Sequence, residues 1–148
     1  MAEYRKDLIA SGRCRPLRRQ PAEILYVDMP VSLLPVSAST GAFLDGEKFE
    51  TVSFPEHLIP RGAEFGVRVS GDSMEPAYRD GQIVWAKRCD TLCPGEVGIF
   101  LYDGDGYIKV YAEDAKERCP VLISYNKRYD PIRVRPDSGF YIAGRVLN

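Results

Sequence analysis

Two residues that could act as a nucleophile and its base lie 36 positions apart in this sequence: Ser73 and Lys109. A serine hydroxyl is a weak nucleophile near neutral pH and needs a base within hydrogen-bonding distance. A lysine amine can be that base only if its surroundings remove its charge, because its ordinary pKa of about 10.4 leaves it protonated at pH 7. The first question is therefore whether these two side chains form a catalytic pair.

Each of the two residues also has a plainer interpretation. Ser73 belongs to the stretch GDS, a common turn composition in which the serine hydroxyl bonds to the backbone of the turn. Lys109 belongs to GYIKVY, where strand alternation places it on the face of Tyr107 and Tyr111. Most lysines in such positions point to water. The local sequence leaves both interpretations open.

Other residues that support hydrolytic or metal chemistry are scarce. The single histidine, His57, stands in the loop-like stretch FPEHLIP, so a Ser-His-Asp triad has weak support. The cysteines are too few and scattered for a disulfide scaffold, and they do not form two pairs with zinc-ligand spacing. They are Cys14, Cys89, Cys93 and Cys119. We expect free thiols, no metal site and no cofactor.

Most of the chain is predicted to be β-structure. Its apolar stretches are short, rich in Val, Ile, Tyr and Phe, and ended by Gly, Pro or Asp, as is typical of strands. The expected strands are 24–27, 65–69, 82–87, 97–102, 107–111, 121–125, 132–134 and 140–146. The run Asp-Gly-Asp-Gly at 103–106 predicts a tight hairpin turn. Only residues 2–10 and a turn or so around 74–78 look helical.

Length and composition are those of one globular domain, with 148 residues, 45% of them hydrophobic, 28% charged, and a net charge of −1. Residues 1–20 carry six basic and two acidic side chains. We predict a basic linker with a short helix over 1–30 and one domain over 31–148. Its first part, 31–60, is proline-rich and is expected to be an extended arm. No signal peptide or spanning helix is visible, so we expect a cytoplasmic protein without membrane contact.

Three stretches, in order, resemble the self-cleaving domain of LexA/UmuD-type proteins and prophage repressors, the S24 peptidases. They are FGVRVSGDSMEPAYRDGQIVWAKR, LCPGEVGIFLYDGDGYIKVY, and LISYNKRYDPIRV followed by FYIAGRVL. In that family a Ser-Met pair carries the nucleophile and the general-base lysine follows some three dozen residues later, which matches Ser73 and Lys109. The resemblance covers about residues 31–148. It implies a mostly β, LexA/signal-peptidase-like fold of short, strongly bent strands with little helix.

The resemblance also implies roles for individual residues. A neutral Lys109 would take the proton of Ser73, and Ser73 would attack a peptide carbonyl of the chain's own arm. The backbone N–H groups of Ser73 and Asp72 would stabilise the oxyanion. Met74 and Pro76 would keep the nucleophile turn rigid. In this interpretation the enzyme is a serine endopeptidase that acts on itself.

The bond that would be cut is placed by counting. In the family it lies about 35 residues before the serine and is usually Ala-Gly or Cys-Gly, which here leads to the bond between Ala38 and Ser39 in VSASTGAF. Ser39 stands where relatives have glycine. Glycine relieves backbone constraint, so a serine there could slow cleavage. That the run is an uncut linker stays open.

The family's biology supplies the expected partners. In LexA-like and prophage repressors this domain dimerises a helix-turn-helix DNA-binding domain and ends repression when it cuts itself after DNA damage, with a recombinase filament as a candidate trigger. We expect a homodimer through strand 140–148, and DNA contact only through a helix-turn-helix domain absent from this chain. Two alternatives stay open: a UmuD-like accessory protein of an error-prone polymerase, and a non-proteolytic dimerisation or sensing module. A signal peptidase is disfavoured, because neither a membrane helix nor its late polar motif appears.

Overall fold

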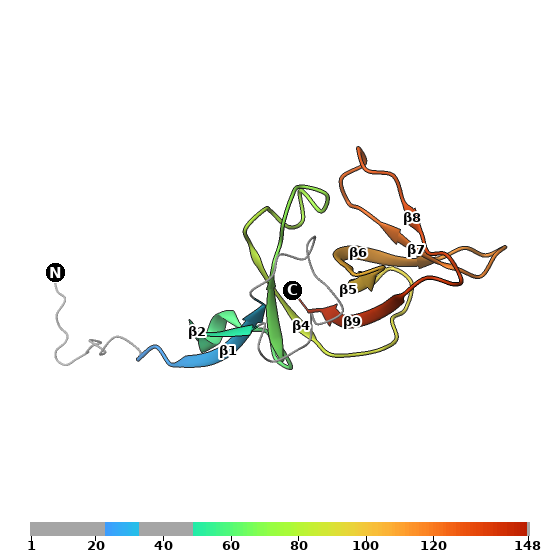
Figure 1. Ribbon diagram of the computed structural model, residues 1–148. Coiled ribbons are helices and arrows are strands. Elements are labelled where there is room, and N and C mark those ends of the chain that lie inside the picture. Colours follow the sequence, from blue (N-terminus) through green and yellow to red (C-terminus); the bar gives the residue numbers. More distant parts are fainter. Residues whose placement is uncertain (1–22, 33–48, 148) are drawn as a thin grey trace, which may run out of the picture.

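The protein is almost entirely β in the computed structural model, which describes residues 23–32 and 49–147 (Figure 1). Within these ranges nine strands form one mixed sheet in the order β2-β1-β3-β4-β9-β5-β6-β7-β8. The strands are β1 Tyr26–Ser32, β2 Phe49–Pro55, β3 Phe65–Arg68, β4 Ile83–Lys87, β5 Val97–Tyr102, β6 Asp105–Glu113, β7 Pro120–Ile123, β8 Ile132–Arg133 and β9 Phe140–Val146. The predicted mostly β fold with little helix is confirmed.

The hairpin between β5 and β6 forms where the sequence predicts it. Asp103 and Gly104 make the two-residue turn, with φ angles of 53° and 88°, and Tyr102 pairs with Asp105 across it. Positive φ at both central residues is the geometry that matches the twist of the flanking strands. The bounds of β5 and β9 agree with the predicted ones, and β6 is longer than predicted at both ends.

The proline-rich arm is more regular than we expected. β1 and β2 pair antiparallel along seven residues, from Tyr26 with Pro55 to Ser32 with Phe49, and β1 is joined to the rest of the sheet by a parallel pair between Val31 and Gly66. Proline lacks the N–H donor and has a fixed φ, and Pro55 ends its strand, where one missing donor matters least. Over β1 and β2 the arm is therefore paired into the sheet, which the sequence did not predict.

Helix is confined to one short element in the described residues. A 3-10 turn at Glu56–Leu58 follows β2, and no helix there is long and apolar enough to cross a membrane. Near 74–78 the chain makes a single turn, in which the Tyr78 N–H donates to the Met74 carbonyl at 3.0 Å. The helix expected at 2–10 lies outside the described residues.

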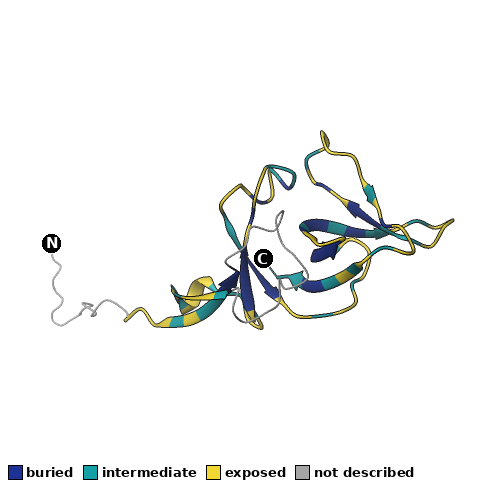
Figure 2. Cartoon of the chain, in the orientation of Figure 1, coloured by how far each residue is buried: buried dark blue, intermediate teal, exposed yellow. Residues whose placement is uncertain are grey.

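Strand β5 is buried from Gly98 to Tyr102 (Figure 2), and its side chains alternate between two core clusters. Ile99 and Leu101 pack into the first cluster, and Phe100 and Tyr102 into the second. The first cluster also contains Phe65, Val67, Val69, Met74, Tyr78, Val84, Ala86, Ile108 and Ala143, and the second Tyr111, Leu122 and Val134. The side chains of β6 also divide between the two clusters, with Ile108 in the first and Tyr111 in the second. The second cluster therefore covers the face of β6 that carries Tyr111.

The C-terminal strand β9 lies inside the sheet. It pairs with β5 along most of its length and with β4 at Arg145 and Val146. The sequence alone did not show these neighbours, because alternation along a strand says nothing about what lies beside it.

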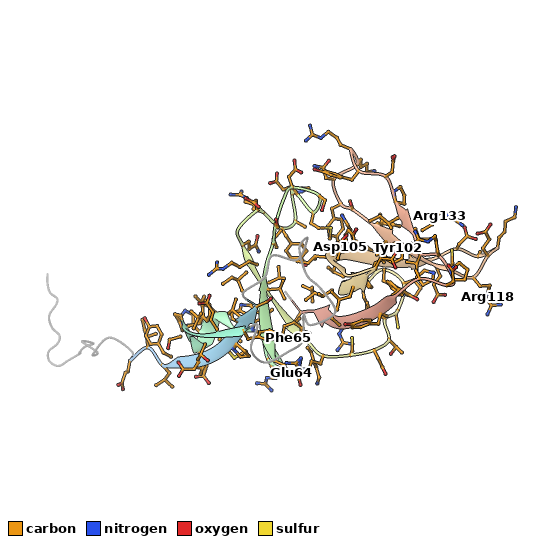
Figure 3. All side chains as sticks on the ribbon, in the orientation of Figure 1. Glu64, Phe65, Tyr102, Asp105, Arg118 and Arg133 are labelled. Carbon is orange, nitrogen blue, oxygen red and sulfur yellow. The ribbon has the colours of Figure 1, made fainter. Side chains whose placement is uncertain are left out.

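Gly144 marks a tight contact between β9 and its neighbours. A Cβ atom there would lie 2.9 Å from the Lys87 carbonyl oxygen and 3.1 Å from the ring of Phe65, which comes from the start of β3 (Figure 3). We predict that Gly144→Ala lowers the free energy of unfolding by about 1–3 kcal/mol, the usual cost of overpacking, measured by urea denaturation. Gly139→Ala is the control, because its Cβ would meet only Asp103 Oδ1 at 3.8 Å. Equal stabilities of the two variants would contradict this packing.

Candidate active site

A cavity of about 350 Å³ brings Ser73 and Lys109 together. One wall is the segment from Val69 to Met74, which follows β3, and another is the part of β6 from Gly106 to Lys109. Ser124, Tyr129, Asp130 and Ile132 complete the lining. Residues from three separate parts of the chain therefore meet around the two side chains that the sequence singles out.

Ser73 is presented by a turn whose second end is fixed in the core. Before it, Gly71 has a φ of 89°, a conformation that favours glycine. After it, Met74 is 1% exposed and packs into the first core cluster. Glu75 N–H donates to the Asp72 carbonyl at 3.2 Å and closes the turn. Pro76 follows through a cis peptide bond and is exposed, so of the two residues expected to support the turn, Met74 is the one that packs in the core.

Lys109 is buried, with 6% of its surface exposed. It lies in the middle of β6, opposite Gly98 of β5. A Cβ atom at Gly98 would lie 2.3 Å from the Leu92 Cδ1 atom, so Leu92 fills the space that a side chain at 98 would take. The plain interpretation of Lys109 as a lysine that points to water is wrong.

Burial also changes the acidity of this lysine. Removal of water from around the amine lowers the pKa of Lys109 below its ordinary value, because a buried site disfavours the charged form. No carboxylate forms an ion pair with it among the residues that the structure describes. The neutral amine, which is the form that can accept a proton, is therefore easier to reach in this site than in water.

The amine has one hydrogen-bond partner that the sequence did not reveal. Lys109 Nζ donates to Ser124 Oγ at 2.7 Å, and Ser124 is itself 7% exposed. β6 and β7 pair antiparallel with Val110 opposite Ile123, so the same register continued by one residue places Ser124 opposite Lys109. A serine in the otherwise apolar run VLIS was the available signal, but sequence alone does not fix the register.

The segment after β7 also fastens the nucleophile turn. Asn126 donates its backbone N–H to the Ser73 carbonyl at 2.9 Å and its side-chain amide to the Asp72 carbonyl at 3.1 Å. The Asp72 carboxylate accepts from the Tyr129 hydroxyl and, at 3.2 Å, from Arg128. The hydrogen bond from Tyr129 is the main cause that lowers the pKa of Asp72. Ser73 and its neighbour are therefore held by the same segment that carries Ser124.

The remaining predicted residues fall in different places. Asp72 and Ser73 line the cavity, and the role of their N–H groups towards an oxyanion stays a prediction. His57 is exposed in the 3-10 turn and is not part of the cavity lining. Ala38, Ser39 and Cys14 lie outside the described residues.

The other three cysteines are free thiols, and over 23–32 and 49–147 no three His, Cys, Asp or Glu residues are arranged to hold a metal. They are Cys89, Cys93 and Cys119.

Comparison with known proteins identifies a family that this chain matches. Residues 30–147 match the family model described as Peptidase S24-like. The LexA repressor of Carboxydothermus hydrogenoformans is 26% identical over 99 residues, which cover 66% of this chain and 48% of that protein. The LexA repressor of Novosphingobium aromaticivorans is 29% identical over 126 residues, or 82% and 53% of the two chains. The chain spans about half the length of the curated relatives it matches.

The lowered pKa of Lys109 predicts a pH-dependent stability. In the unfolded chain the lysine keeps its proton up to a pH of about 10.4, whereas in the folded chain it loses it at lower pH. Between the two pKa values the unfolded state binds more protons, so stability should rise with pH. Lys109→Met lacks this rise. The free energy of unfolding of this variant minus that of the parent should therefore be larger at pH 7 than at pH 10. Urea denaturation of both chains, each carrying Ser73→Ala, measures the difference.

Lys127→Met is the matched control, because Lys127 is exposed. Its stability relative to the parent should be similar at the two pH values. If Lys109→Met behaves in the same way as this control, the pKa of Lys109 does not change on folding.

Proposed function

Because this chain belongs to the Peptidase S24-like family, we propose that it is the self-cleaving domain of a LexA-like repressor. The observation that carries the proposal is that Lys109, buried and without a carboxylate partner among the described residues, lines the same cavity as Ser73. A deprotonated amine beside a serine hydroxyl is the arrangement that activates a serine without histidine.

The proposed reaction is peptide-bond hydrolysis in two steps. The neutral amine of Lys109 takes the proton of the Ser73 hydroxyl as Oγ bonds to the Ala38 carbonyl carbon. The backbone N–H groups of Asp72 and Ser73 stabilise the oxyanion that forms. The Ala38–Ser39 bond breaks as the lysine gives its proton to the nitrogen of Ser39. Water then hydrolyses the ester on Ser73, with Lys109 again as the base, and restores both side chains.

The strand register supports the choice of bond. Val31 of β1 pairs in parallel with Gly66 of β3, so the two strands are offset by 66 − 31 = 35 residues. Ala38 precedes Ser73 by 73 − 38 = 35 residues. β1 and β3 run in the same direction at this pair. In sequence, seven residues lead from Val31 to Ala38 and seven from Gly66 to Ser73. A segment that is part of the same chain needs no encounter step, so its effective concentration at the serine is high.

The biological role follows from the relatives. They are named LexA repressor, and we place this chain in the same role: a cytoplasmic regulator in which cleavage ends repression in a DNA-damage response. A helix-turn-helix domain would supply the DNA contact, and a recombinase filament is the proposed trigger. A homodimer would form through the C-terminal strand, residues 140–148, as the resemblance to the family implies.

Purified protein incubated between pH 7 and about 10 tests the activity by intact mass. We predict fragments 1–38 and 39–148, which appear faster as the pH rises because the lysine loses its proton. Ser73→Ala and Lys109→Ala should be cut at least about 100-fold more slowly, the scale on which a nucleophile or general base acts. His57→Ala, at an exposed residue outside the cavity, should be cut like the parent. A parent that stays whole, or variants cut as fast as it, would contradict self-cleavage.

The serine at position 39 gives a second prediction for the same reaction. Ser39→Gly should be cut about two- to fivefold faster than the parent, because glycine adopts constrained backbone conformations at lower cost. Ser37→Gly, two residues earlier, serves as the control for a general gain in chain flexibility. Equal acceleration by both substitutions would mean that the backbone at 39 has no special part in the reaction.

A further inference from the structure

We propose that Ser124 is the positioning residue of Lys109: its hydroxyl oxygen fixes the amine at the wall of the cavity so that the nitrogen lone pair is directed to Ser73. The proposal rests on the self-cleavage proposed above and adds a residue to it. Its basis is the hydrogen bond of 2.7 Å from Lys109 Nζ to Ser124 Oγ.

This hydrogen bond joins two polar side chains that have little access to water. Lys109 is 6% exposed and Ser124 is 7% exposed. Buried polar groups need hydrogen-bond partners inside the protein, and each of these two side chains provides one for the other. Their cross-strand position makes the contact a product of the β6–β7 register rather than of a flexible loop.

The bond restricts how the amine can turn. A neutral lysine amine has two hydrogens and one lone pair. With one N–H bound to Ser124, the lone pair can face only a limited range of directions around that bond. Ser73 lies on another wall of the same cavity. A general base must direct its lone pair at the proton it removes, so the contact with Ser124 prepares the amine for this step.

The Ser124 hydroxyl also affects how strongly Lys109 holds the proton that it gains. A hydrogen bond from an ammonium group is stronger than one from a neutral amine. Ser124 therefore stabilises the ammonium form, which the lysine has after it takes the serine proton. This interaction opposes part of the lowering of the Lys109 pKa by burial. Loss of the hydroxyl should lower the pKa of Lys109 further while it releases the amine from its position.

Ser124 and the serine turn are linked through one short segment. Asn126, two residues after Ser124, binds the Ser73 carbonyl through its backbone N–H. The base and the nucleophile are thus both attached to the chain between 124 and 126. The other titratable groups that face the cavity are Asp72, Tyr107, Tyr129 and Asp130. The centroid of the Tyr129 ring lies 5.7 Å from Lys109 Nζ.

The first test does not need cleavage. In a chain that carries Ser73→Ala and ¹³C-labelled lysine, the chemical shift of the Lys109 Cε carbon gives its pKa. Ser124→Ala should lower this pKa, and Ser124→Thr, which keeps a hydroxyl, should restore it. Ser138→Ala is the matched control, because Ser138 also makes a single side-chain hydrogen bond, to the Arg135 carbonyl, away from the cavity. An unchanged or raised pKa in Ser124→Ala would overturn the proposal.

The second test is the rate of cleavage at high pH, where the lysine is neutral in every variant. Ser124→Ala should lower this limiting rate by about 10- to 100-fold, as small misplacements of catalytic groups do, while Ser124→Thr and Ser138→Ala keep it. A rate in Ser124→Ala within twofold of the parent would overturn the positioning role. If the parent itself is not cut, self-cleavage fails, and the pKa measurement alone decides whether Ser124 controls Lys109.

Discussion

An ammonium group gives up most of its hydration when Lys109 folds into the middle of β6. Removal of a charge from water is costly, so a protein must supply a counter-ion or let the group lose its proton. The described part of the chain supplies no carboxylate to this lysine; it supplies the neutral hydroxyl of Ser124. The lowered pKa is the result, and the chemistry that we propose for the cavity follows from it.

The sheet creates this environment through three adjacent strands. β6 lies between β5 and β7, so a side chain at its centre has strands on both sides. On the β5 side the partner is Gly98, and the space is filled by Leu92. On the β7 side the register leads to Ser124. A larger residue at 98 would meet Leu92 and Phe100, so the burial of the lysine depends on small residues beside it.

The parts of the fold and of the site that could be predicted from sequence are those with local patterns. Turn residues and alternation defined β5, β9 and the hairpin at Asp103, because these signals act over a few residues. The spacing of Ser73 and Lys109 pointed to one site because it matches a family pattern. The pairing of β1 with β2 was missed, since contacts between segments far apart leave no local signal and the prolines favour a loop. Alternation likewise could not say that the face of Lys109 is covered by a second cluster, nor that the register brings Ser124 to the amine.

The most direct test of the central claim is the distance between Lys109 Nζ and Ser73 Oγ in a crystal structure of the protein grown above pH 9. If burial prepares the amine to act on the serine, Nζ should keep its contact with Ser124 and lie within about 3.2 Å of Ser73 Oγ, the reach of a general base. A nitrogen that points to solvent, or a Ser73 side chain turned out of the cavity, would contradict the account.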